Sequence, residues 1–393
     1  MRIAQIHNKY KDIGGEDIVV HREKELLEKA GHEVSQFFVL NEHISGTAAK
    51  LKTALGVPYN FSSKKKVQAF LEREKPDVVH VHNFLPVLSP SVFYACKALN
   101  LPVVLTLHNF RLLCVNGLLY RDEHVCEDCI SNKIAYSGIK HGCYQDSSIA
   151  SIFPAISNGL HTSLGTWYEK IDKVIFLSLF SKEVFDRSHM SFRADQVAIK
   201  SNFIADKGFS YAKEDYYLFV GRLSEEKGIR TVLEAFESNK KKLIVVGDGP
   251  LRSEVDAASL RSPNIRCVGF QNSDQLKARY INAKATIFAS KMYEGLGLVN
   301  IESFSFGTPV IGPSFGNAGQ LVQDGLNGIK YDLGVASSLE NAIIKFENLE
   351  ESDHLNKGAR TTFEQQFTAH KNLELLLQIY QEAIENSNAT VIT

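Results

Sequence analysis

The stretch ATIFASKMYEGLGLVNIE, residues 285–302, contains the pattern that decides the fold. An apolar run over Ala285–Phe288 predicts a buried strand, and the segment from Gly297 onward predicts a helix. A glycine-containing turn joins the two. A strand that leads into a helix through a short turn is the building unit of parallel sheets. Two carboxylates, Glu294 and Glu302, flank the turn and the helix start.

The same alternation extends in both directions along the chain. Helical patterns separate the predicted strands, so each half should form a parallel sheet with helices on both faces. We therefore expect an α/β protein with two doubly wound, Rossmann-like domains facing a central cleft. Ligands of such sheets bind outside the carboxyl ends of the strands. The predicted strands are Arg2–Ile6, Glu33–Phe38, Val78–Val81, Val103–Leu107, Val174–Leu177, Tyr217–Val220, Lys242–Val246, Ile265–Val268, Ala285–Phe288 and Pro309–Ile311, and the predicted first-half helices are Asp17–Ala30, Val67–Glu74, Ser91–Leu99 and Ser181–Arg187.

The 393 residues suffice for two domains. The polar stretch ADKGFSYAKED, residues 205–215, marks the expected boundary between domains 1–205 and 206–370. An insertion over residues 111–145 carries cysteines. Residues 371–393 read as a helix that either completes the second domain or crosses back to the first.

Composition limits the partners. The net charge of −1 provides no general field for nucleic acid, and the 44% hydrophobic content supports sizeable cores. With neither a secretory signal nor an 18-residue apolar run, the chain is expected to be cytoplasmic. The lysines at 64–66 favour a solvated helix face, and weak peripheral contact with anionic lipid at the inner membrane face is the open alternative.

Two motifs of the second half combine cations with carboxylates. GRLSEEKG, residues 221–228, follows a predicted strand and offers Arg222 and Lys227 to a diphosphate; a charged surface loop is the alternative. Glu294 can accept hydrogen bonds from a hexose, and Glu302 from ribose hydroxyls. The helix N-terminus at Gly297 can hold a phosphate oxygen. This combination suits glycosyl transfer from a nucleotide sugar.

The remaining candidates lie at predicted strand ends. Gly14-Gly15-Glu16 precedes a helix and can approach a phosphate, although the pair of glycines by itself favours a tight loop without a ligand. Among the strand-end histidines we favour His108 for function and a structural role for the others, which are His7, His80 and His82. Asp248 of VVGDGP is predicted to cap the next helix, with Pro250 in its first turn.

Together these motifs resemble the family 4 retaining glycosyltransferases of the GT-B fold, also described as glycosyl transferases group 1. GRLSEEKG, VVGDGP, EGLGLVNIE, FGTPVIG and VQDGLNG carry the resemblance in the second half, with PDVVHVHNF and LPVVLTLHNFRLLCVNG in the first. The resemblance implies catalytic roles for His108, Glu294, Arg222 and Lys227. It implies a donor site formed by Gly15, Glu16, Arg222, Lys227, Asp248, Gly269, Phe270, Glu294, Gly297, Leu298, Val299 and Glu302.

The resemblance also implies a reaction. A hexose or related sugar would pass from a UDP- or GDP-sugar to a hydroxyl of a glycan or lipid-linked acceptor, with retention at the anomeric carbon. The chain has no Asp-x-Asp sequence, which would hold a divalent ion against a diphosphate, so we expect metal-independent transfer with no cofactor required. A nucleotide-sugar epimerase, a phosphorylase of the same architecture, and a non-catalytic nucleotide-sugar-binding protein are the alternatives.

Two further segments leave alternatives open. Cys114, Cys126, Cys129 and Cys143 lie within 30 residues and include one CxxC spacing. They could hold a structural zinc, less readily an iron–sulfur cluster, or remain thiols. The apolar stretch Ser147–Trp167 is predicted to pack inside the first domain, with an acceptor groove or membrane contact as the alternative.

Overall fold

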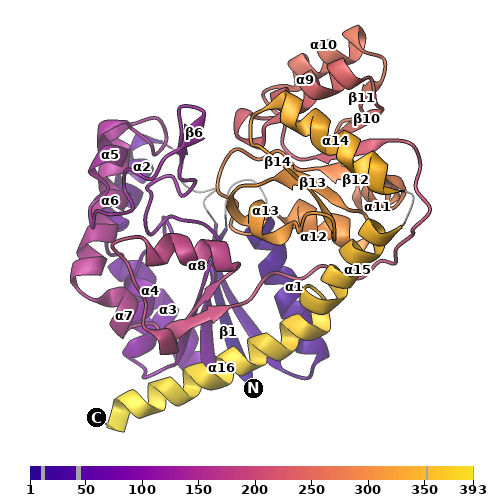
Figure 1. Ribbon diagram of the computed structural model, residues 1–393. Helices are drawn as coiled ribbons and strands as arrows, with labels where there is room; N and C mark the ends of the chain where they lie inside the picture. Colours follow the sequence, from indigo (N-terminus) through magenta and orange to yellow (C-terminus); the bar gives the residue numbers. More distant parts are fainter. Residues whose placement is uncertain (10–13, 41–45, 351–352, 393) are drawn as a thin grey trace. The chain divides into compact units, whose positions relative to one another are not determined.

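A computed structural model describes residues 1–9, 14–40, 46–350 and 353–392 (Figure 1). The chain divides into two compact units. The first comprises Met1–Leu119, Cys126–Lys200 and Asn372–Thr393, and the second comprises Tyr120–Val125 and Ser201–Lys371. Within the described residues, no helix combines the length and the apolar character needed to cross a bilayer.

The first unit is built on a parallel sheet of six strands in the order β2-β1-β3-β4-β7-β8. In the register of this sheet, Ile3 lies opposite Val34 on one side and Val78 on the other. The order reverses between β1 and β3, where ligands of open α/β sheets commonly bind. The strands are β1 (Arg2–Lys9), β2 (Glu33–Leu40), β3 (Val78–Val81), β4 (Val103–Leu107), β7 (Lys173–Phe176) and β8 (Val197–Ile199).

Helix α16 (Ala369–Ile392) packs against this first sheet, although it follows the whole second unit in the sequence (Figure 1). Leu376, Ile379 and Tyr380 join a buried cluster with Ile3 and Val78. The other helices here are α1 (Gly15–Lys29), α2 (Thr47–Gly56), α3 (Phe61–Glu74), α4 (Ser91–Lys97), α5 (Tyr136–Lys140), α6 (Ser148–Ser163), α7 (Thr166–Glu169), α8 (Leu179–Asp186) and the short η2 (Ala194–Gln196). Strands β5 (Tyr120–Arg121) and β6 (His124–Val125) form a hairpin that belongs to the second unit.

The second unit contains a second parallel six-stranded sheet, in the order β11-β10-β9-β12-β13-β14, which reverses between β9 and β12. Tyr217 and Ile287 pack with α9 on one face, while Leu218 and Val246 pack with α11 and with Phe306, which follows α12, on the other. The elements are β9 (Tyr217–Val220), η3 (Glu225–Lys227), α9 (Ile229–Asn239), β10 (Leu243–Val246), α10 (Arg252–Arg261), β11 (Ile265–Cys267), α11 (Ser273–Asn282), β12 (Ala285–Ile287), α12 (Leu298–Ser305), β13 (Val310–Pro313), α13 (Gly316–Leu321), β14 (Gly328–Tyr331), α14 (Ala336–Glu350) and α15 (His354–Gln366).

The predicted α/β fold with two parallel sheets is confirmed. Strands β8 and β14 were missed because each is short and follows a polar stretch. The predicted capping role of Asp248 is wrong, since α10 begins at Arg252 with Leu251 as its N-cap. The Asp248 carboxylate instead accepts a hydrogen bond from the Gly249 amide at 2.8 Å. Pro250 therefore precedes the helix rather than lying in its first turn.

Candidate functional site

In the second unit, the loops after β9 and β12 meet at the point where the strand order reverses. Gly228 makes this contact sterically feasible. Its φ is +70°, and a Cβ atom there would lie 2.0 Å from the carbonyl oxygen of Ala289. The amide of Lys291 also donates to the Glu226 carbonyl at 2.8 Å. The two loops are therefore joined backbone to backbone, which fixes the positions of the side chains they carry.

Lys227 and Glu294, which lie 67 residues apart in the sequence, form an ion pair across these loops, with Nζ 2.5 Å from Oε1. Ser290 donates a second hydrogen bond to the same carboxylate oxygen at 2.9 Å. Both members of the pair keep some solvent access, with 26% of the Lys227 and 17% of the Glu294 side chain exposed. The ammonium and the carboxylate are therefore held in place, and a ligand can still reach them.

Helix α12 starts immediately after this loop, at the N-cap Gly297 with φ +74°. The amides of its first turn, which include those of Leu298 and Val299, have no acceptors within the helix and favour an anion. Glu302, one turn further on, accepts a hydrogen bond from the Tyr280 hydroxyl at 3.1 Å. The helix start therefore presents amides, with a positioned carboxylate following it.

Two polar side chains here were not identified from the sequence. Asn317 of α13 donates to the carbonyl of Leu296 and so ties down the glycine turn. Asn300 is fully buried, and neither polar atom of its side chain has a hydrogen-bond partner among the described residues. An asparagine inside a helix is common in sequences, so neither role carries a sequence signal.

The other predicted donor residues of this unit lie on adjoining loops. Arg222 is exposed in the loop after β9. The Leu223 amide donates to the Asp248 carbonyl at 2.9 Å, which links that loop to the one after β10. Gly269 accepts from the Gly247 amide at 3.0 Å. The neighbouring Phe270 is 84% exposed, as a stacking surface for a base would need to be.

In the first unit, His108 directly follows β4, and its Nε2 lies 3.1 Å from Nδ1 of His82. The Asn109 amide donates to Glu16 Oε1 at 2.8 Å, which connects this strand end to the first turn of α1, next to Gly15. These residues line one pocket. Its polar lining comprises Glu16, His82, Asn83, Thr106, His108, Asn109 and Arg111.

The glycine turn before α1 is fixed by Asp17. One carboxylate oxygen accepts from the Gly14 amide at 2.8 Å, and the other lies 2.9 Å from Nε2 of His7. This contact agrees with a structural role for His7, which stays a prediction. The contact links the end of β1 to the helix N-terminus, where the sequence analysis placed a phosphate-approaching loop.

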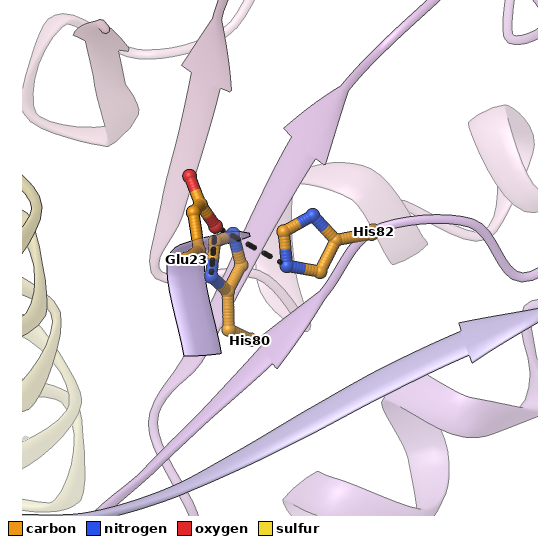
Figure 2. Close-up of side chains that lie close together, drawn as sticks. All are labelled: Glu23, His80 and His82. Atoms are coloured by element: carbon orange, nitrogen blue, oxygen red, sulfur yellow. Dashed lines mark ion pairs between the residues drawn. The ribbon is translucent and has the colours of Figure 1, made fainter. Parts of the chain in front are cut away.

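Glu23, His80 and His82 form a buried cluster (Figure 2), which contacts His108 through His82. Glu23 Oε2 lies 3.6 Å from His82 Nε2 and 3.9 Å from His80 Nδ1. The other carboxylate oxygen accepts from the Lys200 ammonium at 2.7 Å, and both of these side chains are at most 2% exposed. Burial alone would raise the pKa of Glu23, but the charge of the Lys200 ammonium and its hydrogen bond outweigh burial and lower the pKa.

The three histidines are neutral near pH 7. Burial lowers the pKa of His108 and lowers the pKa of both His80 and His82 well below its ordinary value. His80 is held on both sides, with Nδ1 2.8 Å from the Tyr380 hydroxyl and Nε2 2.8 Å from the Thr106 hydroxyl. This agrees with a structural role for His80.

The cluster has the residue types of a metal site, because its donor atoms all lie within 4.8 Å of one another. Two observations argue against a cation there. The Lys200 ammonium already neutralises the carboxylate, and both nitrogens of His80 have hydrogen-bonding neighbours. We therefore interpret the cluster as a polar network rather than a metal centre.

Cys114, Cys126 and Cys143 are all close enough to Cys129 to act on its thiol electrostatically. Among the described residues, however, the cysteines form no three-donor group like that of Glu23, His80 and His82. Cys114 and Cys129 are buried, whereas Cys126 and Cys143 are partly exposed. Burial, opposed in part by a backbone hydrogen bond from Gly138, raises the pKa of Cys129 to about 11, and the other three cysteines contribute. A structural zinc there stays a prediction.

Solved structures with the same architecture are glycosyltransferases of the GT-B class. Sucrose-phosphate synthase from Thermosynechococcus elongatus aligns with a TM-score of 0.68 at 18% identity, covering 97% of this chain and 98% of that one. HepE from Anabaena, in complex with UDP, aligns with a TM-score of 0.67 at 18% identity, covering 96% and 99%. These likenesses show that the chain has the GT-B fold.

Sequence comparisons identify the family. Residues 13–204 match the family model Glycosyltransferase Family 4, and residues 200–362 match Glycosyl transferases group 1. An uncharacterized glycosyltransferase of Methanocaldococcus jannaschii is 25% identical over 351 residues, 84% of each chain. This chain belongs to glycosyltransferase family 4.

Proposed function

We propose that the second unit binds the diphosphate of a nucleotide sugar and that the chain transfers the sugar to an acceptor hydroxyl. One observation carries the proposal: an ammonium and a carboxylate, Lys227 and Glu294, are fixed together where the strand order of the second sheet reverses. That location is where sheets of this kind bind ligands.

The pair supplies complementary chemistry. The departing diphosphate gains negative charge as the glycosidic bond breaks, and a pre-positioned cation stabilises that charge. We assign this task to Lys227 and Arg222, together with the first amides of α12. Glu294 accepts hydrogen bonds from hydroxyls of the transferred sugar, and Glu302 from the ribose. In the first unit we propose that His108 contacts the transferred sugar and that the backbone at Gly15 and Glu16 lies close to the diphosphate.

For the donor we propose a UDP-sugar, with a GDP-sugar as the alternative. HepE, which shares the fold, binds UDP. Phe270, which is exposed beside Gly269, would stack on the base. We further propose transfer with retention and without a metal ion. A chelator should then leave the rate unchanged, and magnesium-dependent recovery after chelation would contradict this part.

For the acceptor we propose a glycan or lipid-linked hydroxyl. Helix α6 buries one face, including Ala155 and Ser151, as predicted for its apolar segment. Its other face exposes Ile149, Ile156 and Leu160 by 73%, 46% and 42%. An apolar face in contact with water suits a lipid tail or weak peripheral contact with a membrane.

The test begins with a thermal-shift screen of UDP- and GDP-sugars. A ligand at 100 times its Kd should stabilise the protein by about 2.7 kcal/mol. Nucleoside diphosphate release with the best donor is then measured for Lys227→Ala. We expect roughly a 100-fold loss in kcat/KM, which is typical when one transition-state donor is removed.

Lys242→Ala is the matched control, because Lys242 pairs with Asp215 before β10, and 65% of its side chain is exposed. It should keep full activity. An unchanged rate for Lys227→Ala, or stabilisation by no nucleotide sugar, would refute the proposed site.

A further inference from the structure

The buried cluster of Glu23, His80 and His82, which contacts His108 through His82, contains an uncommon arrangement of unpaired polar atoms. Glu23 Oε2 and His82 Nε2 are both buried, and neither has a hydrogen-bond partner among the described residues. They face each other at 3.6 Å, as Figure 2 shows. The distance is too long for a good hydrogen bond, but in a buried environment the charge of the carboxylate still acts strongly on the ring.

The carboxylate determines where the proton of neutral His82 resides. Glu23 is ionised because it accepts from the Lys200 ammonium. A negative oxygen favours an N–H over a lone pair on the ring atom it faces, so the proton is on Nε2 of His82. Neutral imidazole carries only one proton, so Nδ1 of His82 is an acceptor.

The next ring follows from the same rule. His82 Nδ1 lies 3.1 Å from His108 Nε2, so Nε2 of His108 must be the donor in this pair. His108 is neutral as well, which leaves a lone pair on its Nδ1. The hydrogen bond that one ring nitrogen makes commonly fixes the tautomer of a functional histidine in this way.

We propose that Glu23 and His82 are positioning residues that hold His108 in the Nε2–H tautomer, so that Nδ1 accepts a hydrogen bond from a hydroxyl of the transferred sugar. This inference rests on the proposed function of the chain. It gives Lys200 a role as well, because its ammonium keeps the Glu23 carboxylate ionised inside the protein.

The experiment uses full-length protein labelled with 15N-histidine, because ring 15N chemical shifts distinguish the two neutral tautomers directly. Signals are assigned by their loss in His82→Gln and His108→Gln. In the wild type both rings should be Nε2–H. An Nδ1–H signal for His108 would overturn the proposal without any variant of Glu23.

Glu23→Gln provides the second arm. The new amide N–H would face His82 Nε2 and favour a lone pair there, so both rings should switch to Nδ1–H. His108 would then present a donor instead of an acceptor, and kcat/KM should fall about 10- to 100-fold. Glu25→Gln is the matched control, since Glu25 lies on the same helix with 51% of its side chain exposed and pairs only with the surface residue His21. It should change neither the His82 and His108 signals nor the rate.

The two readouts separate this inference from the proposed function. Unchanged tautomers in folded Glu23→Gln would overturn the network, even if the protein transfers sugar. Tautomers that switch as expected support the network, and the complete absence of transfer from any nucleotide sugar would then count against the proposed function alone.

Discussion

Replacing Lys200 with methionine should strongly destabilise the first unit. Its Nζ lies 2.7 Å from Glu23 Oε1, the two side chains are 1% and 2% exposed, and Asn372 Oδ1 is a further neighbour at 3.3 Å. Methionine has a similar volume, so the main effect is a buried carboxylate without its cation. Breaking a buried pair in this way costs about 3–5 kcal/mol, a large part of the roughly 5–15 kcal/mol that stabilises a typical domain.

The chain contains a suitable reporter. Trp167 is the only tryptophan of the sequence, it belongs to the first unit, and it is fully buried. Its fluorescence during urea unfolding therefore follows this unit separately. Lys24→Met is the control, because Lys24 pairs with Glu28 on the surface of α1. Surface pairs are worth about 0–1 kcal/mol.

Two comparisons complete the experiment. Glu23→Gln combined with Lys200→Met removes both charges and should recover most of the lost stability. Lowering the pH should also destabilise the wild type more than this double variant. The pKa of Glu23 lies below its ordinary value of 4.5 in the folded protein, so its stabilisation is lost as the pH falls below that value. A loss below about 1 kcal/mol in Lys200→Met would refute the reasoning.

Three further predictions concern other parts of the chain. Gly228→Ala should destabilise the second unit by roughly 2–4 kcal/mol, because the new Cβ would overlap the Ala289 carbonyl. Unfolding followed by far-ultraviolet circular dichroism measures this loss. Gly325 also has a positive φ but has open space around it, so Gly325→Ala should lower the stability far less. Burial lowers the pKa of Lys213 from 10.5 to about 7 in the folded protein. Between these pH values the unfolded chain binds one more proton than the folded protein, so the melting temperature should rise from pH 7 to pH 10. A rise that persists in Lys213→Met would contradict this. If the four cysteines hold a structural zinc, metal analysis should find about one zinc per chain, lost in Cys129→Ser; a metal-free wild type would exclude the site and leave the cysteines as thiols.

Much of the fold could be predicted because strand and helix patterns are local properties. The strand Val78–Val81 and the strand Tyr217–Val220 have the predicted bounds, since each is a short buried run followed by turn residues. Strand β14 was not predicted. Its stabilising partner is β13, at Val310–Pro313, and that pairing is not visible in the residues of Gly328–Tyr331 themselves.

The candidate site was predicted only in part, for a similar reason. Lys227 and Glu294 lie in glycine-rich loops after strands, and that context is visible in a sequence. Glu23 lies in a helix full of charged residues and Lys200 at the end of a short strand, so each resembles a solvated surface residue. Their pairing over 177 residues depends on how α1 and β8 pack, which is a property of the tertiary structure.

The return of α16 to the first sheet has a consequence for the order of folding during synthesis. A ribosome produces strands β1–β8 well before Leu376 and Tyr380, so one face of that sheet remains without its cover until the second unit has been translated. The second unit needs no later segment and can fold earlier, despite its later position in the chain. Nascent chains that stall after residue 370 would then expose an apolar surface to chaperones and proteases.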